Sequence, residues 1–152
     1  MQSVKMICFD MDGTIADLYA VDNWLAKLRA EDASPYRNAS PMWNMRELNK
    51  VLMLLEKEGW EIRVISWLSK DSTEEYKAAV REAKESWLRK YDFPAQKCHF
   101  VRYGATKADS VRKCADYAIL IDDNEKVRKG WSLGDTIDPT AVNIIEILSG
   151  LL

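Results

Sequence analysis

Short apolar segments alternate with amphipathic segments along this chain, and this alternation restricts the possible folds more than any other feature. Residues 4–9 form a nearly continuous apolar run, which is typical of a strand buried on both faces. Further strands are predicted at 60–66, 98–102, 118–121 and 134–138, and helices at 17–30, 42–58, 72–91, 107–114, 124–131 and 141–151. The pattern predicts an α/β protein with a doubly wound parallel sheet.

Length and charge narrow the class further. The 152 residues suit a single domain, and 22 basic against 24 acidic residues give a net charge of -2, so we expect no general nucleic-acid binding. The apolar runs are too short for a signal peptide or a membrane span, so no membrane partner is expected. Cys8, Cys98 and Cys114 are odd in number and far apart, which favours reduced thiols and a cytoplasmic protein.

Acidic residues follow two of the predicted strands directly. The first strand runs into Asp10-Met11-Asp12-Gly13-Thr14, and the fourth runs into Asp122-Asp123. Because ligands bind beyond the carboxyl ends of parallel strands, we expect these carboxylates to converge if the two strands are neighbours. Such a cluster requires a cation, and its oxygen ligands favour Mg²⁺.

The spacing gives the two aspartates of the first loop different tasks. Asp10 and Asp12 point the same way on an extended segment, so one can bind metal and attack while the other lies beside the leaving oxygen. Gly13 has no side chain to keep the backbone from a phosphate. Ser66 ends the second strand with a hydroxyl donor, and Lys107 offers an ammonium group to a phosphate and to Asp10.

At these residues the chain resembles the haloacid dehalogenase superfamily. Its four motifs are an aspartate pair, a Ser or Thr, a Lys and a terminal acidic pair, and this sequence carries Asp10 with Asp12, Ser66, Lys107, and Asp122 with Asp123. The resemblance implies a sheet of about five strands in the order 3-2-1-4-5, with a small helical cap insert at about 17–41. It also implies that Asp10 is the nucleophile and Asp12 the acid/base group. The Mg²⁺ ligands would be Asp10, the Asp12 backbone carbonyl and Asp122, with Asp123 acting through water.

A narrower resemblance is to the 5'(3')-deoxyribonucleotidase branch. The segments FDMDGTIADL at 9–18 and SWLRKY at 86–91 are similar to that branch, as is the spacing from Arg102 and Lys107 to Asp122. Two features depart from it, because the insert is short and Trp67-Leu68-Ser69 replaces the usual small-residue and proline turn. The resemblance implies a nucleoside monophosphate substrate, with Asp17, Trp24, Tyr36 and Trp67 as candidate substrate-binding residues.

Simpler interpretations exist for several of these residues. The first loop could be a calcium-loop fragment, although no further ligands follow at the required spacing. Asp17 could serve only a helix amino terminus, and Trp24, Tyr36 and Trp43 could be core aromatics instead of base-stacking residues. The charged run at 77–90 is interpreted as a solvated helix face.

The sequence therefore predicts a magnesium-dependent phosphomonoester hydrolase with a small phosphorylated substrate, most simply a nucleotide. Two alternatives remain open. A reduced cap would admit other substrates, such as a polynucleotide end, a phosphoprotein or a sugar phosphate. A catalytically silent regulatory module would retain the fold, although the intact pair of Asp10 and Asp12 argues against it.

Overall fold

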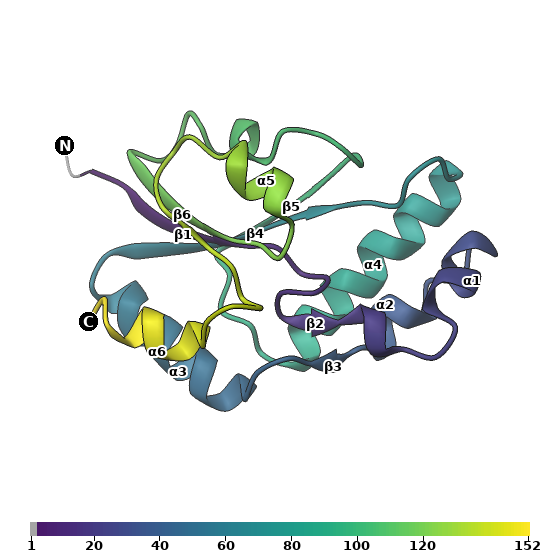
Figure 1. Ribbon diagram of the computed structural model, residues 1–152, viewed down its shortest axis with the longest axis horizontal. Helices are drawn as coiled ribbons and strands as arrows, with labels where there is room; N and C mark the ends of the chain where they lie inside the picture. The colour runs from purple at the N-terminus through teal and green to yellow at the C-terminus, as the bar shows by residue number, and fades with distance from the viewer. Residues whose placement is uncertain (1–2) are drawn as a thin grey trace.

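A five-stranded parallel sheet forms the centre of the protein (Figure 1), whose computed structural model describes residues 3–152. All neighbouring strands run parallel, as the alternating pattern predicted. In sheet order the strands are β5 (Lys97–Val101), β4 (Trp60–Trp67), β1 (Lys5–Phe9), β6 (Tyr117–Ile121) and β7 (Thr136–Ile137). This order, 3-2-1-4-5 in chain terms, confirms the predicted doubly wound α/β fold.

Both faces of the sheet are covered, which explains why residues 6–9 of β1 are all apolar and buried. One face packs against α3 (Met45–Lys57) and α6 (Ile144–Ser149) through Ile7 and Phe9. The opposite face packs through Met6 and Cys8 against a chain segment that contains η2 (Lys107–Ser110) and against Trp131, which follows α5 (Glu125–Lys129). The structure has only the short 3₁₀ helix η2 in the region where a helix was predicted at 107–114. None of the helices in residues 3–152 is long and apolar enough to cross a membrane.

The insert between β1 and α3 differs in detail from the prediction. Its ends pair as a short antiparallel ladder, β2 (Ala16–Asp17) with β3 (Ser40–Pro41). The predicted helix at 17–30 is split into η1 (Leu18–Ala20) and α1 (Trp24–Arg29), because Asn23 adopts a left-handed conformation with φ of 57°. The predicted loop after it contains α2 (Ser34–Asn38), since a proline in the first helical turn begins a helix as readily as it breaks one.

Helix α4 (Glu74–Lys90) joins the insert to the rest of the protein. Its first half packs against the insert through Tyr76, Val80 and Ala83. Its second half reaches the main core through Trp87 and Leu88. The insert is therefore attached to the domain through a helix that also belongs to the core.

Helix α4 begins at Glu74, two residues after the start of the helix predicted at 72–91, and Thr73 is its N-cap. Thr73 Oγ1 accepts the backbone N–H of Tyr76 at 3.1 Å and donates to Glu31 Oε1 at 2.8 Å. The Thr73 N–H donates to Glu31 Oε2 at 3.1 Å. A single threonine thus caps the helix and binds the segment between α1 and α2.

We expect Thr73→Ala to lower the free energy of unfolding by about 1 kcal/mol, the usual cost of a lost helix cap. For a domain of this size the melting temperature should fall by about 2–4 °C in a thermal denaturation experiment. Thr73→Ser retains the hydroxyl and is the matched control. Equal melting temperatures for the Ala and Ser variants would contradict a capping role.

Candidate active site

The polar residues predicted for the site come together at the carboxyl ends of the three central strands. Asp10 follows β1, Ser66 lies near the end of β4, and Asp122 follows β6. These strands are neighbours in parallel register, so their ends lie at the same edge of the sheet. All three side chains are buried. The edge is therefore a polar site built into the core.

Lys107 connects the ends of β1 and β6. Its Nζ donates to Asp10 Oδ1 at 2.9 Å and to Asp122 Oδ2 at 2.8 Å, and its side chain is 3% exposed. Burial alone would lower the pKa of Lys107, but the two carboxylates outweigh that effect and raise it. Lys107 is thus held as a cation beside the predicted nucleophile.

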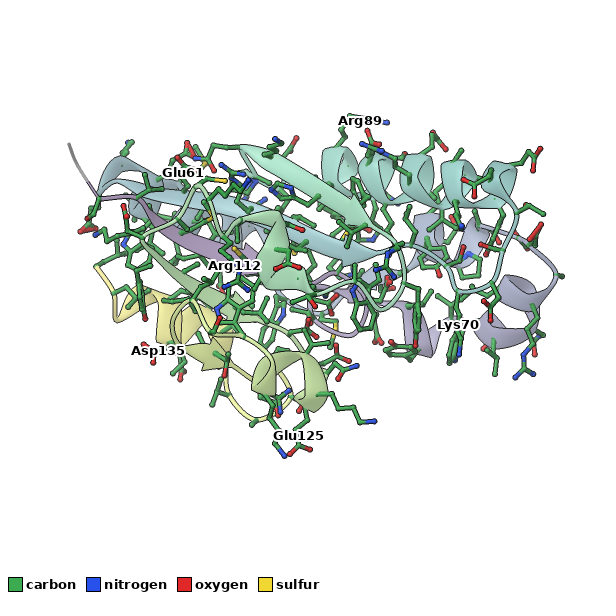
Figure 2. The ribbon with its side chains drawn as sticks, turned by 90° about the horizontal axis from the view of Figure 1, so that it is seen from above. Glu61, Lys70, Arg89, Arg112, Glu125 and Asp135 are labelled. Carbon is green, nitrogen blue, oxygen red and sulfur yellow. The ribbon has the colours of Figure 1, made fainter. Side chains whose placement is uncertain are left out.

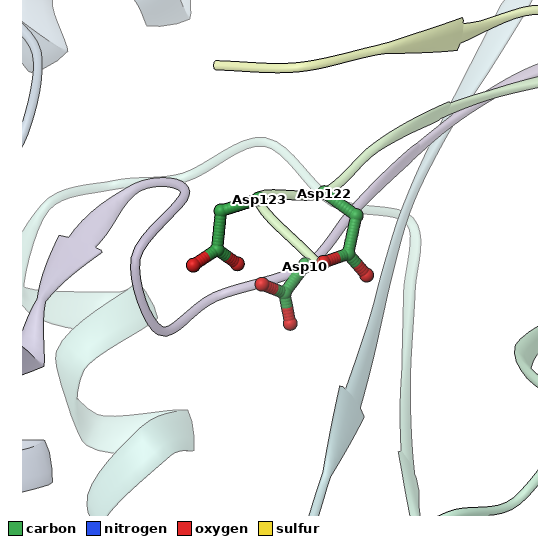
Figure 3. A group of neighbouring side chains, drawn as sticks. All are labelled: Asp10, Asp122 and Asp123. Atoms are coloured by element: carbon green, nitrogen blue, oxygen red, sulfur yellow. The ribbon is translucent and has the colours of Figure 1, made fainter. Parts of the chain in front are cut away.

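Three aspartates form a candidate cation site (Figure 3). Asp10, Asp122 and Asp123 each offer a carboxylate oxygen, and these oxygens lie within 4.8 Å of one another. Burial and the charge of Asp10 raise the pKa of Asp122 to about 6 and that of Asp123 to about 8. Oxygen ligands that repel one another in this way fit a hard divalent cation such as Mg²⁺. The Asp12 carboxylate is not part of this group and turns toward α4.

The first loop is held by two small residues. The Thr14 hydroxyl donates to Asp10 Oδ2 at 3.0 Å and accepts the Asp123 N–H at 3.2 Å, so it joins the first loop to the acidic pair. Gly13 has φ of +80°, and a Cβ there would lie 2.3 Å from Asp123 Oδ2 and 2.8 Å from the Tyr19 ring. Only glycine allows the loop to approach Asp123 this closely.

A second buried lysine reaches the site from α4, where the sequence predicted a solvated face. The Lys84 side chain is 1% exposed. Its Nζ donates to Ser66 Oγ at 2.7 Å, to the Trp67 carbonyl at 2.7 Å and to Asp12 Oδ2 at 3.0 Å. Burial raises the pKa of Asp12, while the Lys84 charge opposes the rise. Ser66, expected to donate to a phosphate, therefore also accepts a bond from a cation.

A cleft of about 620 Å³ opens from these polar groups toward the insert. Trp24, Tyr36 and Trp67, three of the predicted substrate-binding residues, line it. Asp17 is not among the lining residues and instead pairs with Ser40 in the short ladder at the base of the insert. Trp43 donates through Nε1 to the Thr14 carbonyl at 2.7 Å, so its role in the structure is to hold the first loop.

Two aromatic pairs stand in this cleft. Tyr19 and Trp24 from the insert have ring centroids 4.9 Å apart. Trp67 at the end of β4 and Tyr103 in the loop after β5 have theirs 5.0 Å apart. One tyrosine of each pair is half exposed, Tyr19 at 51% and Tyr103 at 50%. The cleft therefore presents two aromatic surfaces to a bound molecule.

Sequence reasoning missed Thr14, Tyr19, Lys84 and Tyr103. A signal for Lys84 was present, because it lies four residues after Val80 and three before Trp87, on the apolar stripe of its helix. Thr14 belongs to the quoted motif, yet its two hydrogen bonds depend on the fold. Neither tyrosine carried a sequence signal, since their positions follow from the packing of separate loops.

Comparison with known proteins places the fold in a known class. No protein-family model and no curated protein matches the sequence. Among solved structures, a chain of the Pnkp1/Rnl/Hen1 complex superposes with a TM-score of 0.61 and 18% identity, covering 91% of this chain and 46% of that one. A chain of the Pnkp1/Rnl/Hen1 RNA repair complex gives 0.58 and 18%, over 90% and 42%. This chain thus spans less than half the length of those two.

A D,D-heptose 1,7-bisphosphate phosphatase from Burkholderia thailandensis matches over nearly its whole length. The TM-score is 0.53 at 11% identity, and the match covers 95% of this chain and 99% of the other. At such identities the similarity establishes a shared fold. The fold is the doubly wound α/β architecture that the sequence predicted.

We expect Mg²⁺ to stabilise the protein more at pH 8 than at pH 5. A carboxyl whose pKa is raised by folding favours the folded state while protonated, so metal-free protein should lose stability as the pH rises from about 4 to about 8. Magnesium competes with those protons and relieves the repulsion, so its benefit grows over the same range. The melting temperature should be measured with chelator and with Mg²⁺ across this range.

Two variants locate the effect. Asp123→Asn should reduce both the pH-dependent loss and the gain from Mg²⁺, because it removes one member of the carboxylate group. Glu56→Gln, an exposed position on α3, should change neither. A gain from Mg²⁺ that is independent of pH and of Asp123 would exclude these aspartates as the cation site.

Proposed function

We propose that the protein is a magnesium-dependent phosphomonoester hydrolase that acts through an aspartyl-phosphate on Asp10. The observation that carries the proposal is the pairing of two carboxylates with different surroundings at one end of the cleft. Asp10 is held by Lys107 and Thr14 beside the acidic pair, whereas Asp12 is held by Lys84 on the side of the insert. The different partners of the two carboxylates suit different roles, with Asp10 as the nucleophile and Asp12 as the acid/base group.

In the first step, Asp10 attacks the phosphorus atom and the bond from phosphorus to the ester oxygen breaks. Asp12 gives its proton to that oxygen, and the alcohol leaves. The raised pKa of Asp12 supports this role, because a carboxyl must hold a proton to act as an acid. Lys107 and the Ser66 hydroxyl would bind the non-bridging phosphoryl oxygens.

In the second step, Asp12 takes a proton from water as that water attacks the aspartyl-phosphate. The acyl-phosphate bond between Asp10 and phosphorus breaks, which releases inorganic phosphate and restores the Asp10 carboxylate. Asp10, Asp122 and Asp123 would hold Mg²⁺, which supplies charge neutralisation for the phosphate when bound. Residues on rigid strand ends thereby keep the attacking group in line with the phosphorus atom.

A nucleoside monophosphate is the favoured substrate. The cleft volume of about 620 Å³ lies within the range of small-ligand sites. The exposed rings of Tyr19 and Tyr103 offer surfaces on which a base can stack. These aromatic surfaces agree with the sequence resemblance to the nucleotidase branch.

The phosphorylated end of a polynucleotide is a second candidate. Arg29 and Lys70 also line the cleft. Figure 2 shows Lys70 beside the insert. The positive charges of these two side chains would attract further phosphate groups of a bound polynucleotide. The structural similarity to a chain of an RNA repair complex is consistent with this candidate.

We expect Asp10→Asn to abolish turnover, with a loss of several orders of magnitude, because an amide is not a nucleophile toward phosphorus. The wild-type protein should also form a phosphorylated peptide containing Asp10, detectable by mass spectrometry after acid quenching. Asp92→Asn makes the same change at an exposed position that does not line the cleft and should retain activity. A folded Asp10→Asn protein with substantial turnover would contradict the assignment of the nucleophile.

A substrate panel should separate the two candidates. Tyr103→Ala and Trp24→Ala should lower kcat/KM for a nucleoside monophosphate about tenfold or more, since stacking on an aromatic contributes about 1–3 kcal/mol. Hydrolysis of ethyl phosphate, which has no ring, should change little. Parallel losses on both substrates together with a lower melting temperature would indicate a packing role instead.

The double variant Arg29→Ala/Lys70→Ala tests the polynucleotide candidate. It should reduce kcat/KM for a 3'-phosphorylated oligonucleotide and weaken its dependence on salt, while a mononucleotide is unaffected. A wild-type preference for the mononucleotide with no effect of this variant would exclude the polynucleotide candidate. A preference for a sugar phosphate over both would exclude base recognition altogether.

A further inference from the structure

Lys84 is a second buried cation at the site, and the four motifs do not account for it. It extends from the middle of α4, between the part that packs on the insert and the part that packs in the core. A lysine is seldom buried this fully unless it is paired. A buried ion pair adds little net stability, because both charges lose their hydration. The contacts of Lys84 therefore call for a functional explanation.

All hydrogen-bonding capacity of Lys84 is already used within the protein. An ammonium group has three N–H donors, and three acceptors surround it: Ser66 Oγ, the Trp67 carbonyl and Asp12 Oδ2. The ring of Tyr36 lies 4.9 Å from Nζ on the insert side. Lys84 thus has no donor left for a substrate phosphate, which separates it from Lys107.

These contacts have two directional consequences. Because Ser66 Oγ accepts from Lys84, its own hydrogen must point elsewhere and is free to donate to a phosphoryl oxygen. Because Asp12 Oδ2 is bound to Lys84, Oδ1 is the oxygen left to carry the proton for the leaving group. One ammonium group fixes the orientation of both side chains.

We propose that Lys84 is a positioning residue that aligns Asp12 with the leaving-group oxygen and orients the Ser66 hydroxyl toward the phosphate. This inference rests on the proposed phosphatase function and goes beyond its four motifs. Proton donation matters most when the departing oxygen is a poor leaving group. Loss of Lys84 should therefore affect esters unequally, according to how much help the leaving group needs.

The experiment compares kcat/KM for ethyl phosphate, whose alkoxide leaves poorly, with that for 4-nitrophenyl phosphate, whose phenoxide leaves well. This parameter covers the steps up to release of the alcohol, so hydrolysis of the phosphoenzyme does not obscure the comparison. For Lys84→Met we expect a loss of about 100-fold or more with ethyl phosphate. The loss with 4-nitrophenyl phosphate should be about tenfold or less and reflect the disordered Ser66 hydroxyl.

The effects of Lys84→Met and Asp12→Asn on kcat/KM can also be compared in a double-mutant cycle. A purely structural role of Lys84 would not make its effect depend on Asp12. In an Asp12→Asn background, Lys84→Met should cost only the share due to Ser66, about tenfold or less with ethyl phosphate, because the share that acts through Asp12 is already lost. Lys90→Met, at an exposed position of the same helix, is the matched control and should behave as wild type. Lys84→Gln retains a donor and serves as the second variant if the Met protein folds poorly.

The outcomes separate this inference from the proposed function. Equal losses on both esters with a lower melting temperature, or additive effects of Lys84→Met and Asp12→Asn, would overturn the positioning role while leaving the phosphatase in place. Undiminished activity of both Lys84 variants would do the same. A wild-type protein that hydrolyses no phosphomonoester with Mg²⁺ would overturn both.

Discussion

Repulsion among carboxylates at one edge of the sheet is the constraint on which the site depends. Asp10, Asp12, Asp122 and Asp123 all lie where β1 and β6 end, and burial strengthens their mutual repulsion. Two ammonium groups offset part of it, and each is hydrogen-bonded to different carboxylates. A divalent cation would complete the neutralisation and leave the cleft able to accept a phosphate dianion. Charge balance thus explains why so many acidic groups can share a buried site.

The two lysines also connect the chemistry to separate parts of the fold. Lys107 comes from the segment that follows β5 and covers one face of the sheet, whereas Lys84 comes from α4. Because α4 packs on both the insert and the core, the position of Lys84 depends on both. Tyr36 of the insert lies over the same ammonium group. The insert therefore contributes to the surroundings of Asp12 as well as to the wall of the cleft.

The parts of the structure that could be predicted are those set by strand pattern. Apolar runs followed by Asp10 and by Asp122 place both residues at one sheet edge in any parallel arrangement where the two strands are neighbours. The split of the helix at 17–30 could not be predicted, since Asn23 gives no strong local signal for its left-handed conformation. Lys84 escaped prediction because its helix also carries many exposed charges. Its place on the apolar stripe of α4 was the local signal for its burial, whereas its partners at the end of β4 depend on a tertiary contact.

The polar groups of the site and the aromatic groups of the cleft belong to different parts of the fold. Substrate specificity could therefore change without a change in the carboxylates. Asp10, Ser66 and Asp122 are fixed by the ends of buried strands, whose positions tolerate little change. The aromatic pairs belong to the insert, to the last residue of β4 and to the loop after β5, and one ring of each pair is half exposed. Changes in those loops can alter which molecule is held without moving the carboxylates. A change at Lys84 would affect both, because this residue lies on the helix that packs on the insert and contacts Asp12 and Ser66.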